Sequence, residues 1–477
     1  MKNILITILA VCFPFIGVGQ EIIDLGNRRE IFIDRYLIER LDGLSLKMHA
    51  PRDEGPVFYF DRSWEGAFSG YTTVIKDTDR FRLYYRGEAI AGEDGNEGEV
   101  TCYAESEDGI HWERPNLGLY PIGGNVILTG TPPFSHNFAP FIDTKPGISH
   151  TERYKALSGT AESGLVAWVS SDGIHWKKKQ EKCVMEKSDY AWAFDSQNVA
   201  FWSDHEQRYV CYFRTVYADE GWYRTMDRAV SDDFLHWSKG TRMTYGNTPR
   251  EQLYTNQTSP YFRAPHIYIA IGGRFMPGRQ VVSDEQAQAL NVFQGYYKDC
   301  SDGYLMSSRG GNVYDRTFME GFIRPGIGMN NWVSRTNYPA CNVVQTGENE
   351  MSLYVNQDNA QPTIHLRRYS MRLDGFSSLA APYSGGEMIT KCFTFSGTQL
   401  EINYSTSAAG GLAFEIQDEN GVPLPGYTME DADEMIGNEI ARIVSWKGKT
   451  DVQPLASKKI RLRVRMNDAD LFAIKFN

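Results

Sequence analysis

The stretch "SEDGIHW" at residues 106–112 is repeated almost unchanged as "SSDGIHW" at residues 170–176. A third version, "SDDFLHW", occupies residues 231–237. Weaker versions, "SSRGGNVY" at 307–314 and "RLDGFSSL" at 372–379, continue the series, so that successive segments start about 61 to 76 residues apart. A period of tens of residues is the signature of a repeat architecture.

Each of the three strong segments follows the same series of short alternating runs. Before residues 170–176 the chain reads "FAPFID", a turn, "RYKALSG" and "LVAWVSS". Such runs, bounded by Gly, Asp and Pro, predict β-strands, and Asp-Gly supplies the positive φ of a tight turn. We interpret the segment as structural and expect its Trp to be buried. Four strands per repeat and five repeats predict a five-bladed β-propeller over residues 50–382.

The rest of the chain predicts three further parts. Residues 1–19 combine a basic start, an apolar run and small residues, which indicates a secretory signal peptide and therefore a secreted or periplasmic protein. Residues 20–49 are expected to be a lead-in that packs on the propeller or closes its ring. Residues 383–477 contain alternating runs such as "LEINYS" and "IRLRVRM", which predict a small antiparallel β-sandwich.

Composition limits the partners. The formal net charge is −11, so the basic surface of a nucleic-acid-binding protein is not expected. No later run is long and apolar enough to predict a membrane span. The sequence has no His/Cys cluster with zinc spacing, and we expect no metal site or cofactor. Two acidic segments, "EDADE" and "NDAD", lack the full calcium-loop pattern but leave a bound calcium open. The oligomeric state is also left open.

Propeller topology predicts where a ligand would bind. We name the strands of a blade A to D from the axis outwards. The D→A connections and B→C hairpins share one face, and the mouth of the axis on that face is a natural pocket. Amide and carboxylate groups there match sugar hydroxyls, and aromatic rings match sugar C–H surfaces. The B→C loops add further acids, among them Glu88. The predicted carbohydrate-binding residues are His136, Asn137, Trp192, Gln197, Asn256, Gln257, Arg274, Trp332, Arg335, Asn337 and Tyr338.

The S-x-D-G-x-x-W segments, the five repeats and the trailing β-sandwich resemble secreted bacterial propeller proteins similar to glycoside hydrolase family 32. More broadly, the chain looks like the five-bladed glycosidases of families 32, 43, 68 and 117. The resemblance implies catalytic acids at the A-strand starts of blades one, two and three. Blade one offers Glu65 or Asp61, blade three offers Asp195, and blade two has Asn137 instead of an acid. The family 32 signatures W-x-N-D-P-N-G, R-D-P and E-C are missing.

The leading hypothesis is an exported glycoside hydrolase that acts on the ends of poly- or oligosaccharides from the axis pocket. Such enzymes generally need one neutral and one charged carboxyl group, and we predict Glu65 and Asp195 for these roles, with Asp302 and Glu320 as reserves. One alternative is a carbohydrate-binding propeller without turnover, which the missing acid of blade two favours. Another is a sialidase-like enzyme or a lyase, for which several arginines and Tyr338 are available.

Overall fold

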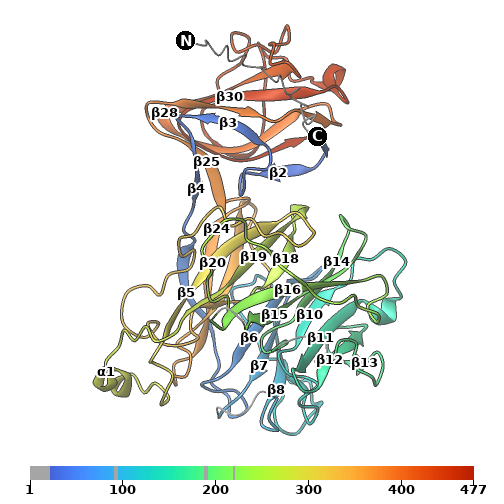
Figure 1. The fold of residues 1–477 in the computed structure, drawn as a ribbon, viewed down its shortest axis with the longest axis vertical. Helices are drawn as coiled ribbons and strands as arrows, with labels where there is room; N and C mark the ends of the chain where they lie inside the picture. The colour runs from blue at the N-terminus through green and yellow to red at the C-terminus, as the bar shows by residue number, and fades with distance from the viewer. Residues whose placement is uncertain (1–21, 91–94, 187–191, 219–220) are drawn as a thin grey trace, which may run out of the picture.

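The computed structural model describes residues 22–90, 95–186, 192–218 and 221–477. The predicted signal peptide lies outside these residues. Strands dominate the described chain and form two parts, a propeller in the lower part of Figure 1 and a second β-sheet domain in the upper part. Within the described ranges, the helical elements are one short α-helix and two 3₁₀ turns: α1 (Asp284–Ala289), η1 (His150–Glu152) and η3 (Gln453–Leu455).

The propeller has five blades, which confirms the predicted fold class. Blades one to three each pair four strands in chain order, A to D. Blade four pairs three strands, and two isolated bridges extend its outer edge. The strands of blades one to four are β6 (Gly70–Lys76), β7 (Phe81–Gly87), β8 (Val100–Ser106) and β9 (Val126–Leu128); β10 (Ala139–Ile142), β11 (Tyr154–Thr160), β12 (Gly164–Ser170) and β13 (Lys177–Lys178); β14 (Val199–Ser203), β15 (Arg208–Tyr217), β16 (Tyr223–Ser231) and β17 (Thr241–Arg242); and β18 (Thr258–Tyr261), β19 (Ala264–Met276) and β20 (Cys300–Ser308).

Blade five closes the ring with a strand from the beginning of the chain. Its inner strands are β21 (Tyr338–Pro339), β22 (Val344–Gln345), β23 (Glu350–Gln357) and β24 (His365–Arg372), and its outermost strand is β5 (Arg52–Tyr59). β5 pairs antiparallel with β24, from Arg52 opposite Ser370 to Tyr59 opposite His365. Residues 372–379 therefore do not lead into a fourth strand of the blade. Instead, β25 (Ser377–Ala381) leaves for the second domain.

The second domain is one ten-stranded sheet around its own core. Its strands are β1 (Ile23–Gly26), β2 (Arg29–Ile31), β3 (Ile38–Asp42), β4 (Ser45–Met48), β25, β26 (Gly386–Thr390), β27 (Phe393–Phe395), β28 (Leu400–Asp418), β29 (Asn438–Ile443) and β30 (Ile460–Phe476). The sequence assigned residues 20–49 to a lead-in on the propeller, whereas β1 to β4 pair with the C-terminal strands. Pairing is antiparallel except between β1 and β27.

A buried network of charges joins the two domains. Glu30 on β2 contacts His266 Nε2 of blade four through Oε1 at 2.8 Å, and Arg309 Nη1 through Oε2 at 2.9 Å. Arg309 also donates a hydrogen bond from Nε to Asp34 Oδ2 at 2.9 Å. Since removing one member of a buried ion pair leaves an uncompensated charge, this network fixes the second domain against blade four.

The repeated segments form one and the same turn in blades one, two and three. In the second segment, Ser170 Oγ accepts a hydrogen bond from the Gly173 amide at 2.9 Å, and Asp172 Oδ1 accepts from the amides of Ile174 and His175 at 2.8 Å. His175 Nδ1 lies 2.7 Å from Asp172 Oδ2. The segments at 106–112 and 231–237 repeat this set of contacts. The structure therefore supports a structural role for the segment.

These turns also dock on the neighbouring blade. Tyr84 of blade one donates a hydrogen bond to the Gly173 carbonyl at 2.9 Å, and Tyr354 of blade five donates one to the Gly109 carbonyl at 2.6 Å. Both glycines have positive φ, and a Cβ on Gly173 would lie 2.5 Å from the Tyr84 hydroxyl. The third segment has Phe234 at the glycine position, where its side chain packs in a core cluster that includes Leu157 of blade two.

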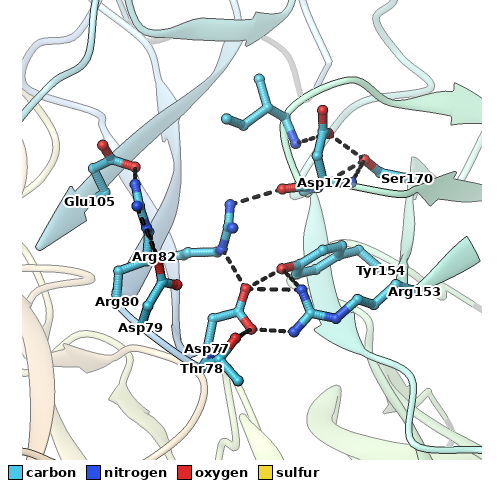
Figure 2. A network of polar contacts seen from close by, with 12 residues as sticks. Asp77, Thr78, Asp79, Arg80, Arg82, Glu105, Arg153, Tyr154, Ser170 and Asp172 are labelled. Atoms are coloured by element: carbon cyan, nitrogen blue, oxygen red, sulfur yellow. Dashed lines mark hydrogen bonds and ion pairs between the residues drawn. The ribbon is translucent and has the colours of Figure 1, made fainter. Parts of the chain in front are cut away.

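Figure 2 shows the polar contacts that reinforce the junction of blades one and two. Arg82 donates from Nε to Asp77 Oδ2 at 3.0 Å and from Nη1 to the Asp172 carbonyl at 2.9 Å. Arg153 and Tyr154 of blade two also bind the Asp77 carboxylate. Burial alone would raise the pKa of Asp77, but the hydrogen bonds from Arg153 and Tyr154 outweigh it and hold this pKa well below its usual range.

The tryptophans of the segments are half-buried, not fully buried as the sequence predicted. Each still packs edge-on against an aromatic ring. Trp176 lies 4.8 Å from Phe138 between ring centroids, and Trp112 lies 5.9 Å from Tyr354. Trp176 also donates from its indole to the Gly173 carbonyl at 3.0 Å. Because the turns are at the rim of the ring, one edge of each indole stays exposed.

We expect Gly173→Ala to destabilise the propeller more than Gly246→Ala. Both glycines have positive φ, but a Cβ at Gly246 would meet nothing within 4 Å. Left-handed backbone costs an L-residue about 1–2 kcal/mol, and the clash with Tyr84 should add about 1–3 kcal/mol at Gly173 only. Urea unfolding of both variants measures the difference, and equal losses would refute the docking role of the turn.

Candidate functional site at the propeller axis

A pocket opens at the propeller axis on the face of the D→A connections and B→C loops. We call it the axis pocket. Its lining comes from blades one, three, four and five: Phe68, Ser69, Gly70, Tyr71, Arg86, Glu88, Asp195, Tyr254, Tyr296, Arg335, Tyr338, Asn356 and Asn359. Of the residues predicted from the sequence to bind or cleave a sugar, it contains Asp195, Arg335 and Tyr338.

The backbone is unusual where the chain enters the A strands. Residues other than glycine have positive φ at or just before the A strand of every blade: Tyr71 (49°), Asn137 (51°), Phe194 (74°), Gln257 (45°) and Asn337 (59°). In blade one, the register of β6 against β7 shifts at this point. Such conformations are uncommon for bulky residues, and they concentrate at functional sites, where the surrounding structure enforces them.

Glu88 is the buried carboxyl group of the axis pocket. Its side chain is 8% exposed and lies 3.3 Å from Arg86 Nη2. Asn96 donates a hydrogen bond to Oε1 at 2.6 Å. Burial raises the pKa of Glu88, and this effect outweighs the opposing attraction of Arg86, while nearby Glu99 raises the pKa further. Glu88 is thus placed to hold a proton more readily than an ordinary glutamic acid.

Asp195 is the exposed carboxyl group of the same pocket. Its side chain is 49% exposed and forms an ion pair with Arg214, whose own side chain is 3% exposed. Arg214 lies on β15, stacks over the Tyr254 ring at 4.3 Å and donates a hydrogen bond to the Tyr254 carbonyl at 3.2 Å. The buried arginine therefore holds the Asp195 carboxylate in place at the edge of the pocket.

Four tyrosines, Tyr71, Tyr254, Tyr296 and Tyr338, form much of the remaining wall. The rings of Tyr254 and Tyr338 lie 5.2 Å apart, and Arg86 stacks over the Tyr71 ring at 4.8 Å. Burial raises the pKa of both Tyr71 and Tyr338, so these phenols stay neutral. Within the described chain, Tyr338 Oη and Ser69 Oγ are buried without a hydrogen-bond partner. An unpaired buried hydroxyl costs about 1–3 kcal/mol, which a polar ligand in the pocket would relieve.

Glu65, predicted as one of the catalytic pair, does not line the axis pocket. Its side chain is fully buried, and Arg114 donates to its two carboxylate oxygens from Nε and Nη2, each at 2.9 Å. Tyr85 and the Arg62 amide also donate to it. All of these contacts satisfy the carboxylate from within the protein. The structure therefore does not bring Glu65 together with Asp195, and it gives Glu65 a structural setting.

The reserve acids also lie outside the pocket lining. Asp302 is held by Arg274, which donates from Nε at 2.8 Å and from Nη2 at 2.7 Å. Arg274 in turn contacts Glu251 at 2.7 Å. These contacts make Arg274 and Asp302 part of an ion network in blade four. Glu320 is exposed on the path from blade four to blade five.

Most of the predicted amide and histidine residues are buried around the axis, where they bind other groups of the protein. Gln197 donates to the Thr73 hydroxyl at 2.8 Å and accepts from Gln257 at 2.7 Å. His136 Nδ1 contacts Glu99 at 2.7 Å. Three further residues bind their neighbours in the same way: Asn137, Asn256 and Asn337. Of the two tryptophans, Trp332 is half-buried, and Trp192 is 61% exposed with its ring 4.8 Å from Trp222.

The sequence reasoning missed several lining residues. Tyr71 follows the polar start of blade one within an apparently ordinary strand run, "GYTTVI". Arg86 lies near the end of β7, and Glu88 directly follows this strand. The rule that B→C hairpins share the pocket face pointed to Glu88, but the sequence did not mark it as a catalytic candidate. Tyr296 and Asn359 lie in long B→C loops of blades four and five. The available signal was the B-strand end, which propeller topology places beside the A-strand start.

The chain was also compared with known proteins. No protein-family profile and no curated protein matches it. A solved structure described as a glycoside hydrolase shares 10% identity, covers 68% of this chain and 92% of its own, and has a TM-score of 0.48. A β-1,2-mannobiose phosphorylase from Listeria innocua shares 10% identity, covers 69% of this chain and 97% of its own, and has a TM-score of 0.44. A fructofuranosidase from Schwanniomyces occidentalis shares 10% identity, covers 88% of this chain and 97% of its own, and has a TM-score of 0.38. These similarities are too low to assign an activity.

Within the described ranges, no helix has the length and apolar character needed to cross a membrane.

We expect Glu65→Gln to lower the free energy of unfolding by about 3 kcal/mol, because breaking a buried ion pair leaves Arg114 uncompensated. Asp61→Asn is the matched control. Asp61 is 60% exposed and lies 3.6 Å from the same arginine, and exposed pairs contribute about 0–1 kcal/mol. Urea unfolding at pH 7 compares the two variants. A loss for Glu65→Gln no larger than that of Asp61→Asn would contradict the structural assignment.

A raised pKa makes Glu88 a source of pH dependence. Between the unfolded and folded pKa values the folded state binds more protons, so this group lowers stability as the pH rises. We therefore expect Glu88→Gln to be more favourable, relative to the unmodified protein, at pH 7 than at pH 4. Urea unfolding at both values measures this. The opposite sign would mean that Arg86 stabilises the Glu88 carboxylate more than burial destabilises it.

Proposed function

We propose that the chain is an exported carbohydrate-active enzyme that binds the end of a poly- or oligosaccharide in the axis pocket and hydrolyses its glycosidic bond. The observation that carries this proposal is the presence of two carboxyl groups in contrasting surroundings within one pocket. Glu88 is buried with a raised pKa, and Asp195 is exposed and paired with Arg214. Pairs of titratable groups whose surroundings separate them in this way are typical of acid and base roles.

The two groups divide the reaction. Neutral Glu88 donates its proton to the glycosidic oxygen, so that the leaving sugar departs as an alcohol. The Asp195 carboxylate faces the positive charge that develops on the sugar ring and acts either as the nucleophile or as the base that activates water. Asp195 thus keeps the role predicted from the sequence, while Glu88 takes the place predicted for Glu65.

Contacts between A strands around the axis support action at chain ends. Gln197 and Gln257 are buried and hydrogen-bonded to each other, and they also donate to the Tyr71 and Pro339 carbonyls. These contacts tie A strands of blades one, three, four and five together around the axis. A polysaccharide could therefore enter by one end and could not pass through the ring.

Binding without turnover is the alternative, and the arginines favour it. Arg86 and Arg214 each pair with one of the two acids, and a carboxylate held by a guanidinium is a weaker base and nucleophile. The same amides, tyrosines and arginines would still bind sugar hydroxyls. Mutation of the two acids separates the alternatives.

In the proposed enzyme, Glu88→Gln and Asp195→Asn each lower kcat by several orders of magnitude, while the sugar still binds because an amide keeps the shape of the carboxyl group. Glu348→Gln is the control, since Glu348 is exposed on an A→B turn of blade five, on the opposite face. Release of reducing ends from a panel of oligosaccharides measures turnover. Binding by both acid variants with unchanged turnover would refute the catalytic pair, and binding by the unmodified protein without any turnover would establish the alternative.

A further inference from the structure

We infer that the carbohydrate bound in the axis pocket carries an anionic group, a carboxylate or a sulfate, and that Arg335 binds it. This inference rests on the proposed function in requiring a carbohydrate in this pocket, and it adds the chemical class of that carbohydrate. It depends on the charges around the pocket, on the way Arg335 is held and on the charge of the whole protein.

The arginines around the pocket differ in whether an acid pairs with them. Arg86 is paired with Glu88 at 3.3 Å, and Arg214 is paired with Asp195. Arg335 has no carboxylate within ion-pair distance among the residues that the structure describes. Arg335 donates a hydrogen bond from Nη1 to the Tyr296 hydroxyl at 3.4 Å.

Two aromatic rings hold the Arg335 side chain in the pocket. Its guanidinium lies 5.1 Å from the centre of the Tyr296 ring and 5.8 Å from that of Tyr254. Its backbone has a φ of 59°, in the left-handed region that disfavours arginine. The residue is exposed and lines the pocket. Two aromatic rings thus position a planar group with five N–H donors, which suits the paired oxygens of a carboxylate or sulfate.

The positive charge of Arg335 contrasts with the charge of the rest of the molecule. The protein has a formal net charge of −11, so its overall field repels anions. Two arginines elsewhere in the structure are instead paired with acids: Arg316 contacts Glu251 at 2.9 Å, and Arg309 contacts both Glu30 and Asp34 at 2.9 Å. An exposed guanidinium left over in a pocket of such a protein is available for an anion that the ligand supplies.

The test compares acidic and neutral sugars that differ in one group. Binding is measured by ligand-observed NMR titration, with D-galacturonate and D-galactose 6-sulfate as the two anionic probes and D-galactose as the neutral one. A parallel set uses D-glucuronate, D-glucose 6-sulfate and D-glucose. We expect an anionic probe to bind at least tenfold more tightly than its neutral counterpart, and we expect this preference to shrink at high salt. The carboxylate and sulfate arms identify which anion is preferred.

Two variants connect the preference to Arg335. Arg335→Gln should remove at least tenfold of the affinity for the anionic probe and change the affinity for the neutral probe less than twofold. Arg324→Gln removes the same charge from an exposed residue outside the pocket lining and should change neither. Arg335→Lys keeps the charge without the paired donors and should give an intermediate affinity. Thermal unfolding of each variant confirms that it is folded.

The outcomes separate the two levels of the proposal. Neutral probes that bind as tightly as the anionic ones would overturn the anionic substrate and leave a carbohydrate pocket standing. An anionic preference that survives Arg335→Gln would overturn the role of Arg335. Failure of all probes, including the oligosaccharide panel above, would overturn the proposed function and this inference with it.

Discussion

The contact between each Ser-Asp turn and the B strand of the neighbouring blade sets the geometry of the ring. The side chains of Ser170 and Asp172 accept hydrogen bonds from the amides of their own turn. In this conformation the Gly173 carbonyl accepts a hydrogen bond from Tyr84 in the adjacent blade. The contact recurs between Gly109 and Tyr354. Where the neighbouring B strand has Leu157 instead of tyrosine, the third turn has Phe234 instead of glycine, and Phe234 packs against Phe141 and Lys155 of blade two. Turn and neighbour have thus changed together, as expected for close-packed surfaces.

Closure of the ring makes the two domains depend on each other. β5 must leave the second domain to complete blade five, and β25 must leave blade five to join the second domain. The chain therefore crosses between the domains in both directions, and the Glu30, His266 and Arg309 contacts seal the junction. A rigid frame of this kind can maintain the positive φ values around the axis, since such conformations persist only where the surrounding structure enforces them.

The sequence predicted what is local and missed what depends on distant partners. Strands A to C and the turn of each repeat could be recognised because their signals lie within a few residues. The place of β5 could not, because its partner strand is more than 300 residues away, as the Arg367–Asp53 pair shows with a separation of 314. Glu65 looked catalytic at the start of blade one, but its burial depends on Arg114, 49 residues later. Glu88 stands out as a candidate acid because of its buried surroundings, which the sequence alone does not show.

In the proposed site, recognition and catalysis act through the same electrostatics. Burial raises the pKa of Glu88 and outweighs the opposing attraction of Arg86. An anionic sugar bound at Arg335 would add negative charge to the pocket, and a nearby like charge disfavours ionisation of a carboxyl group. It would also expel water, which strengthens these interactions. The substrate would therefore help to keep the proton on the acid that cleaves it, whereas a neutral sugar would leave Arg86 to favour the ionised, inactive form.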